Sequence, residues 1–175
     1  MPTPILDQSN TTTNGSVILR RSDGDINNRW GQSFLTGFSG TLDNIRLSLS
    51  KSGSPTGNLK IELYGGDATS PTGSVLSTSA NLDVSTITGS QVEYTLNFSN
   101  DYTLTNNTRY WLVISSNTTQ SNSVCVNIWY NNLSSYANGI NNRADDTTWQ
   151  NDQNGDLYFK TYLIKTLSTG FFNFF

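Results

Sequence analysis

The segment from residue 40 to residue 66 carries the pattern that most constrains the fold. Apolar and polar residues alternate through GTLDNIRLSLSKS and NLKIELYGG, and a turn-forming sequence, GSPTG, separates the two stretches. Successive side chains of a strand point to opposite faces of a sheet, so each stretch has one apolar and one polar face. The pattern predicts a β-hairpin with a buried inner face and a solvated outer face. The inner residues are Ile45, Leu47, Leu49, Leu59, Ile61 and Leu63; the outer residues include Arg46, Ser48, Lys60 and Glu62.

Similar alternating segments recur along the chain, separated by clusters of Gly, Asn, Ser and Asp. No segment has the i, i+3, i+4, i+7 stripe of an amphipathic helix. Many short strands without helices predict an all-β protein, folded as a jelly-roll-like antiparallel β-sandwich. The expected strands are 15–21, 30–36, 41–51, 57–64, 73–79, 90–98, 108–116, 122–130 and 155–165.

The chain of 175 residues has the size of a single domain, and no linker divides it. Residues 15–165 are expected to form the sandwich. Residues 1–14 are polar, contain Pro2 and Pro4, and are expected to form an extended N-terminal arm. Residues 166–175 form an aromatic C-terminal tail, which is expected to be a second arm.

Composition excludes several classes of function. The net charge is −3 and the basic residues are scattered, so the chain lacks the basic patch of a nucleic-acid-binding protein. No apolar run is long enough to span a membrane. The N-terminus has no secretory signal, so synthesis in a cytoplasm is expected. The single cysteine, Cys125, forbids an internal disulfide.

The sequence also lacks the residues of common catalytic sites. It contains no histidine, which excludes the Ser-His-Asp triad and the Cys-His pair. Cys125 lies in the strand-like run SVCVNIWY and is interpreted as a buried structural residue. The only glutamates, Glu62 and Glu93, occupy polar strand positions, where solvated surface residues are expected. We therefore expect a protein that is not an enzyme, with no catalytic residues.

Two acidic loops have the oxygen-rich spacing that a calcium ion requires. One is residues 23–27; the other contains Asp152, Asn154 and Asp156, with Asp145 or Asp146 as a further ligand. Asx-rich turns make similar local hydrogen bonds without a metal, which is the alternative. A structural calcium ion at the second loop is thus one hypothesis, and no other cofactor is expected.

Aromatic residues near the C-terminal half form a candidate glycan-binding platform. Trp129, Tyr130, Tyr136 and Trp149 lie in a loop-rich region with many Asn and Asp residues. Aromatic faces stack on the C–H surface of sugars while amide and carboxylate groups bind the hydroxyls. Packing in the core is the alternative for each. Trp111 lies in the apolar run YWLVI and is expected in the core of a central strand.

The tail ends in GFFNFF, which places Phe171, Phe172, Phe174 and Phe175 within five residues. Burial of one such side chain contributes roughly 1.5–3 kcal/mol, so these residues favour docking strongly. One hypothesis is that they bind a neighbouring subunit, because exposed apolar patches mark interfaces. The alternative is that they complete the domain's own core.

Three pieces of the sequence resemble a group of bacterial and phage domains. They are Gln32-Ser33-Phe34, Ser54-Pro55-Thr56-Gly57 and the segment 104–115 around Tyr110-Trp111-Leu112-Val113. The chain resembles, over about residues 29–163, the choice-of-anchor or carbohydrate-binding-module-like β-sandwich domains. The resemblance implies a jelly-roll-like module for surface attachment, sugar contact or assembly. Such domains are usually parts of exported proteins, and the missing signal favours a virion component instead.

Two functions remain open from the sequence. The first is a structural assembly protein of a phage virion, such as a capsid decoration (cement) protein or a fibre or tail protein. Its partners would be other virion proteins or copies of itself, as a homo-oligomer, and it would be located in the virion. The second is a carbohydrate-binding module that attaches to glycans, with an extracellular or cell-surface location.

Overall fold

The computed structural model describes residues 2–19, 29–99, 102–118, 121, 123–133, 135–145, 148–150 and 155–165. In these residues the strands form two sheets, and each strand pairing is antiparallel. Sheet A contains β1 (Ile5–Asn10), β2 (Gly15–Leu19), β4 (Gly40–Ser52), β8 (Val92–Asn97), β9 (Thr103–Leu104), β11 (Cys125–Asn131), β14 (Asp156–Leu157) and β15 (Phe159–Lys165). Sheet B contains β3 (Arg29–Leu35), β5 (Asn58–Gly66), β6 (Pro71–Thr78), β7 (Leu82–Asp83), β10 (Arg109–Ser116), β12 (Asn141–Asp145) and β13 (Thr148–Gln150).

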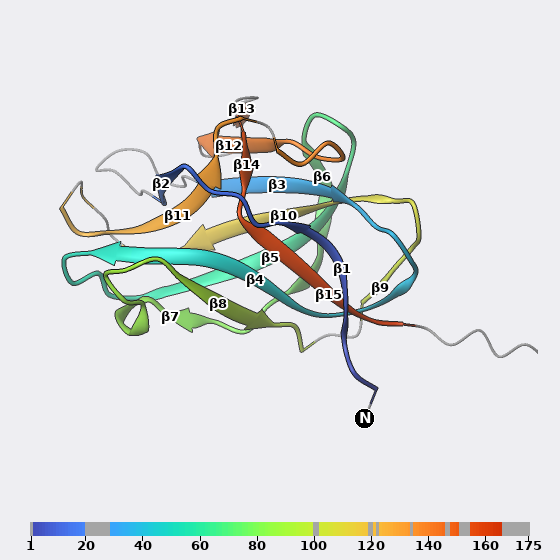
Figure 1. The fold of residues 1–175 in the computed structure, drawn as a ribbon, viewed down its shortest axis with the longest axis horizontal. Coiled ribbons are helices and arrows are strands. Elements are labelled where there is room, and N and C mark those ends of the chain that lie inside the picture. The colour runs from blue at the N-terminus through green and yellow to red at the C-terminus, as the bar shows by residue number, and fades with distance from the viewer. Residues whose placement is uncertain are drawn as a thin grey trace, which may run out of the picture.

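The two sheets pack face to face, which confirms the all-β sandwich. Figure 1 shows the layers, with β15 and β4 of sheet A lying in front of β10 and β5 of sheet B. Within the described residues the only helical element is one 3₁₀ turn, Val84–Thr86. The long strand β4 holds sheet A together because it pairs with β15, β11, β8 and β9. In sheet B the central strand is β10, between β3 and β5.

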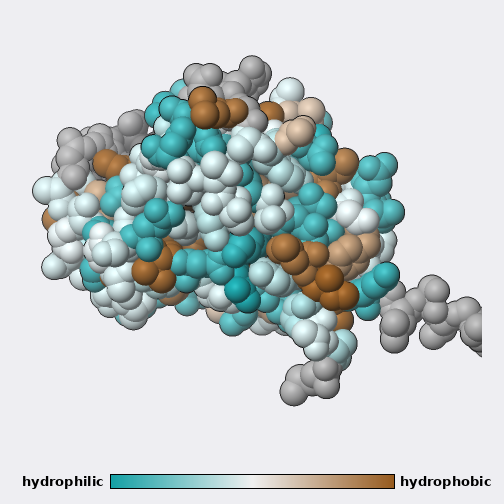
Figure 2. Space-filling view, in the orientation of Figure 1, coloured by the Kyte–Doolittle hydropathy of each residue, from teal (hydrophilic) through white to brown (hydrophobic). Residues whose placement is uncertain are grey.

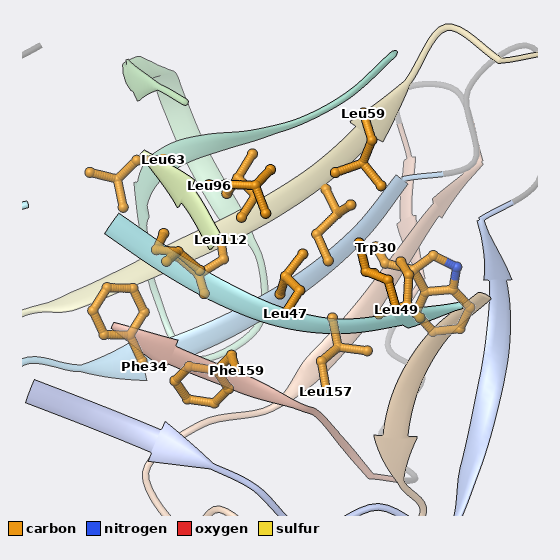
Figure 3. Packing of buried hydrophobic residues seen from close by; sticks show 14 of the residues in the cluster. Trp30, Phe34, Leu47, Leu49, Leu59, Leu63, Leu96, Leu112, Leu157 and Phe159 are labelled. Atoms are coloured by element: carbon orange, nitrogen blue, oxygen red, sulfur yellow. The ribbon is translucent and has the colours of Figure 1, made fainter. Parts of the chain in front are cut away.

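The core lies between the sheets and is built from the apolar face of each strand. All six inner residues expected from the 40–66 pattern have 0% exposure. Figure 3 shows Leu47 and Phe159 of sheet A facing Leu112 and Phe34 of sheet B. The alternation of the sequence thus assigned the buried side chains correctly, because a strand with one apolar face must cover it against another layer.

The 40–66 segment is not a hairpin, however, and that prediction was wrong. β4 belongs to sheet A and β5 to sheet B, so the two strands face each other across the core instead of pairing edge to edge. The connection from Gly53 to Gly57 crosses between the layers. Both glycines have left-handed backbone angles, with φ of 65° and 110°. An alternating pattern with a short turn fits either arrangement, since each buries the same faces.

The outer face of this segment is also less solvated than expected. Ser48 has 2% exposure and Ser50 has 4%, because larger side chains of neighbouring strands cover them. Trp129 of β11 donates a hydrogen bond from Nε1 to Ser50 Oγ at 3.1 Å. Small polar residues in the middle of a sheet face are therefore covered, whereas the pattern alone predicted solvent contact.

The N-terminal segment is part of the sandwich, which corrects the expected arm of residues 1–14. Ile5–Asn10 form β1, the edge strand beside β15. Asn10 has 5% exposure, and its side chain donates to the backbone oxygens of Asp156 and Leu157. The polar composition concealed this strand because its side chains make hydrogen bonds instead of apolar contacts. The predicted C-terminal arm, 166–175, lies outside the described residues.

Most other predicted strands are present, with shifts of a few residues. The hairpin of β12 and β13 was not predicted, because NNRAD and TWQ have too few apolar residues to show alternation. Trp111 is fully buried in the central strand β10, but on the outer face of the sheet and not in the core as expected. Cys125 is fully buried in β11, as expected. None of the described residues forms a helix that is long and apolar enough to cross a membrane.

Candidate functional site

The outer face of sheet B carries a pair of tryptophans. The ring centroids of Trp111 and Trp149 lie 6.3 Å apart, with the ring planes at 42°. Trp111 is fully buried although it points away from the core, whereas Trp149 is half-buried. Gly31 makes room for both rings, because a Cβ there would lie 3.0 Å from Trp149 and 3.3 Å from Trp111. Trp149 is thus the more accessible ring of the pair, and it packs against Gly31 and Trp111.

The connection between β5 and β6 covers one end of this pair. Trp111 Nε1 donates to the backbone oxygen of Asp67 at 3.0 Å, and Asn142 Nδ2 donates to the backbone oxygen of Thr69. The Asp67 carboxylate accepts hydrogen bonds from the Thr69 side chain and from the backbone of Thr69 and Ser70, which lower its pKa. These bonds fix the loop in one conformation over the buried tryptophan.

Polar side chains border the pair on the side of β3 and β5. The guanidinium of Arg29 lies 5.5 Å from the centroid of the Trp149 ring, within the range of a cation–π contact. Tyr64 lies between Arg29 and Glu62, and burial together with the Glu62 charge raises the pKa of its hydroxyl. Lys60 Nζ and Glu62 Oε1 lie 2.7 Å apart. The half-buried ring of Trp149 therefore lies beside the polar side chains of Arg29 and Tyr64. Sugar-binding sites combine aromatic rings and polar groups in this way.

The outer face of sheet A carries a charge cluster around Glu93. Glu93 Oε1 lies 3.1 Å from Arg46 Nη1, and Glu93 Oε2 lies 2.6 Å from Lys160 Nζ. The Tyr158 hydroxyl donates to Glu93 Oε2 at 2.5 Å. Partial burial opposes ionisation of Glu93, but the hydrogen bonds from Lys160, Tyr158 and Arg46 outweigh it and lower its pKa to about 2. The cluster is thus an ion-pair network in which three donors contact one ionised carboxylate.

Aromatic rings surround this charge cluster. The Arg46 guanidinium lies 4.5 Å from the centroid of the Tyr162 ring, and Lys160 Nζ lies 5.6 Å from that of Tyr158. Trp129 lies on the same outer face of sheet A. Tyr158, Lys160 and Tyr162 were not predicted from the sequence. The i, i+2 spacing of Lys160 and Tyr162 in β15, with Tyr158 just before the strand, was the available signal that they share a face.

Two of the four aromatics predicted to bind glycans point into the molecule. Tyr130 is half-buried and packs against the core. Tyr136 has 9% exposure; its hydroxyl donates to Gln8 Oε1 at 2.8 Å, and burial raises its pKa to about 12. Trp129 and Trp149 lie on opposite outer faces of the sandwich. The four residues therefore do not form one platform, and Trp149 is the member that lies against a second tryptophan, the buried Trp111.

Asp156, a predicted calcium ligand, is fully buried, and both of its carboxylate oxygens accept hydrogen bonds from the protein. Its Oδ1 accepts a hydrogen bond from Gln32 Nε2 at 3.0 Å, and its Oδ2 accepts one from the backbone N–H of Tyr136 at 2.8 Å. Burial raises the pKa of Asp156, against the opposing effect of these hydrogen bonds. Asp156 thus links three segments of the chain through hydrogen bonds to residues distant in sequence, which differ from the local bonds of an Asx-rich turn.

The other predicted ligands, Asp152 and Asn154, lie outside the described residues, as do residues 23–27 and Asp146. Among the described residues, no group of three or more His, Cys, Asp or Glu side chains is arranged to hold a metal ion. A calcium ion at the 152–156 loop therefore stays a prediction.

An apolar patch lies where β1 meets the end of β15. Leu6 has 45% exposure and pairs with Tyr162 on the outer face, whereas the exposed Ile5 pairs with buried Leu163 and points to the opposite face. Ile164 is half-buried two positions beyond Tyr162 on the same face. Figure 2 shows a hydrophobic area over these strands. We call Leu6, Tyr162 and Ile164 the β1–β15 patch. The predicted assembly residues Phe171, Phe172, Phe174 and Phe175 lie outside the described residues.

Comparison with protein-family models finds no match for the chain, and comparison with curated proteins finds none either. The resemblance to choice-of-anchor or carbohydrate-binding-module-like domains therefore stays a prediction. Two regions of the surface have features of a binding site: the β1–β15 patch and the Trp149 face of sheet B.

Proposed function

We propose that the chain is a non-catalytic assembly protein that acts by binding copies of itself or other proteins of a larger particle. The narrower form of the proposal is a surface component of a phage virion, namely a capsid decoration protein or a fibre or tail protein. Its place of action is then the virion. A stable sandwich with interaction surfaces at its edge suits this role, because many weak contacts repeated in a symmetric array hold a particle together.

The β1–β15 patch carries this proposal. Leu6, a large aliphatic side chain with 45% exposure, lies on the outer face of an edge strand, next to Tyr162 and Ile164 of the neighbouring strand. The sequence continues beyond Lys165 with ten residues that contain four phenylalanines. Exposed apolar surface next to an aromatic segment is typical of an interface, since water contact of both is unfavourable.

Light scattering after size exclusion tests the proposal. We expect the full-length chain to have the mass of a defined oligomer, and a chain that ends at Lys165 to have the mass of a monomer. Circular dichroism of both proteins controls for folding. Two folded monomers of equal shape would refute association through the C-terminal segment.

A second candidate function is glycan binding on the outer face of sheet B. The observation that favours it is the supported position of Trp149, which rests on Gly31 beside buried Trp111 and next to Arg29. A sugar ring stacked on Trp149 would have the Arg29 and Tyr64 side chains near its hydroxyl groups. Aromatic stacking of this kind tolerates different sugars. The hydrogen bonds from Arg29 and Tyr64 would therefore determine which sugar is preferred.

Titration with a glycan panel distinguishes this candidate. We expect Trp149→Ala to abolish binding, and Trp129→Ala, the matched control on the opposite face, to retain it. Binding that is lost in the control but kept in Trp149→Ala would move the site to sheet A. Absence of binding to any glycan by the wild-type protein would reject this candidate and leave the assembly proposal untouched.

A further inference from the structure

The β1–β15 patch has two properties that bear on what covers it. It is formed by an outer-face pair, Leu6 and Tyr162, and by Ile164 beside them. Tyr162 is held in place by Arg46, whose guanidinium lies 4.5 Å from the ring centroid. The surface is therefore apolar in the middle and bordered by an ordered cationic group. Such a rigid surface suits aromatic side chains, which bind apolar groups and cations alike.

The chain itself supplies a matching segment. Lys165, the last described residue, pairs with Gly40 at the end of β15, so the chain leaves the sandwich beside the patch. Ten residues follow, TLSTGFFNFF. Fully extended, ten residues span about 33 Å. A domain of this length has a radius of gyration of about 16 Å, so the segment is long enough to reach a neighbouring subunit.

We infer that the β1–β15 patch is the docking site for the aromatic C-terminal segment of a second copy of this chain. The inference rests on the proposed assembly function and names its partner and its acceptor surface. The exchange is reciprocal: each subunit gives its segment to the other and receives the other's segment, as a two-fold axis requires.

The size of the segment favours exchange between two copies. Each phenylalanine buries roughly 150–250 Å² when it is fully covered, so four of them bury about 800 Å². Two reciprocal segments then bury about 1,600 Å², which is the usual size of a specific interface.

Complementary variants of the full-length chain test the inference. The first, Leu6→Asp, places a charge in the patch and keeps the segment. The second, Phe171→Ser with Phe172→Ser, keeps the patch and weakens the segment. Val75→Asp is the matched control, because Val75 has 41% exposure on β6, another edge strand, away from the patch. Light scattering gives the mass of each protein, and circular dichroism checks its fold.

We expect the wild type and Val75→Asp to be dimers or higher assemblies. The Leu6→Asp variant and the double Phe variant should each dissociate at a concentration about tenfold higher or more, because a buried unpaired charge or a lost aromatic pair weakens binding. An equimolar mixture of these two variants should associate again, since one has an intact segment and the other an intact patch. This recovery requires contact between different chains.

Other outcomes overturn the inference in different ways. If the double Phe variant is monomeric but Leu6→Asp and the milder Leu6→Ser assemble like the wild type, the segment binds elsewhere and only the assembly function stands. If the wild type is a monomer and both variants are less stable to urea than Val75→Asp, each chain covers its own patch. If the wild type is a monomer and the variants are as stable as the control, both the inference and the proposed function fail.

Discussion

Replacing Glu93 by Gln should remove most of the acid sensitivity that the outer face of sheet A gives to the folded state. The carboxylate of Glu93 contacts Lys160, Arg46 and Tyr158, and its pKa is lowered from 4.5 to about 2. Because the folded state binds this proton less tightly than the unfolded chain does, the stabilisation is complete above about pH 4.5 and is lost as the pH falls toward 2.

The size of the effect follows from the lowered pKa and the exposure of the site. Each pKa unit corresponds to about 1.4 kcal/mol, so the change sets an upper limit of about 3.4 kcal/mol. The Glu93 side chain is 26% exposed and that of Arg46 is 35% exposed, so solvent screens the pair. We therefore expect the network to contribute about 1–2 kcal/mol to the free energy of unfolding at neutral pH.

Urea unfolding at a series of pH values measures this contribution. Between about pH 6 and pH 2.5, the free energy of unfolding of the wild type should fall by about 1–2 kcal/mol more than that of Glu93→Gln. The carboxyls of Asp7 and Asp156, whose pKa values are raised by burial, act in the opposite direction. Both remain in the variant, so their effects cancel in the difference.

The control is Glu62→Gln, which removes a carboxylate with a single ion pair, to Lys60. The extra acid sensitivity that comes from Glu93 should persist in Glu62→Gln, because Arg46, Lys160 and Tyr158 keep their contacts with Glu93. Parallel pH profiles for the wild type and Glu93→Gln would refute the reasoning, since they would mean that Glu93 titrates alike in the folded and unfolded states.

Three further predictions concern stability and use chemical unfolding as the measurement. Leu47→Ala should cost roughly 2–5 kcal/mol, because Leu47 is fully buried in the core; a loss at the level of a surface substitution would contradict the core assignment. Gly66→Ala should destabilise the fold strongly, since the new Cβ would lie 2.5 Å from the Trp111 ring. Gly65→Ala should be nearly neutral, because no atom lies within 4 Å of the new Cβ, and equal effects of the two changes would contradict the packing of the Trp111 ring. Asp156→Ala should cost about 3 kcal/mol, because two buried donors lose their acceptor, and an unchanged midpoint would show that these hydrogen bonds contribute nothing.

The sequence predicted which side chains are buried better than how the strands are arranged. Alternation identified Leu47 and Leu63 as core residues, because burial depends on one face of a single strand. It did not show that β4 and β5 lie in different sheets, since a hairpin and a crossing connection bury the same faces. The arrangement of the strands depends on which strand edges pair with each other. β4 pairs with β15 and β5 pairs with β10, and both partner strands come from distant parts of the chain.

The candidate sites were harder to predict for a related reason. Trp129, Tyr130, Tyr136 and Trp149 are close in sequence, but adjacent residues of a strand point to opposite faces, so Trp129 and Tyr130 cannot share a surface. The support of Trp149 by Gly31 and Trp111 joins segments more than 35 residues apart. The position of Tyr136 was unpredictable for the same reason, because its partner Gln8 lies in an N-terminal strand that has little apolar alternation.

The geometry of β1 indicates how association at the patch would take place. An edge strand presents free backbone groups, and a flat edge pairs readily with strands of other molecules. In β1 the register shifts between Leu6 and Gln8, and the Asp7 side chain accepts a hydrogen bond from the backbone N–H of Gly37, which lies against the strand. Pro4 precedes the strand and lacks an N–H to donate. These features interrupt the edge as a template for strand pairing, while Leu6 still presents its side chain to solvent. Association at this site is therefore expected to use side-chain contacts, which makes Leu6→Asp a more sensitive test than a change of backbone hydrogen bonding.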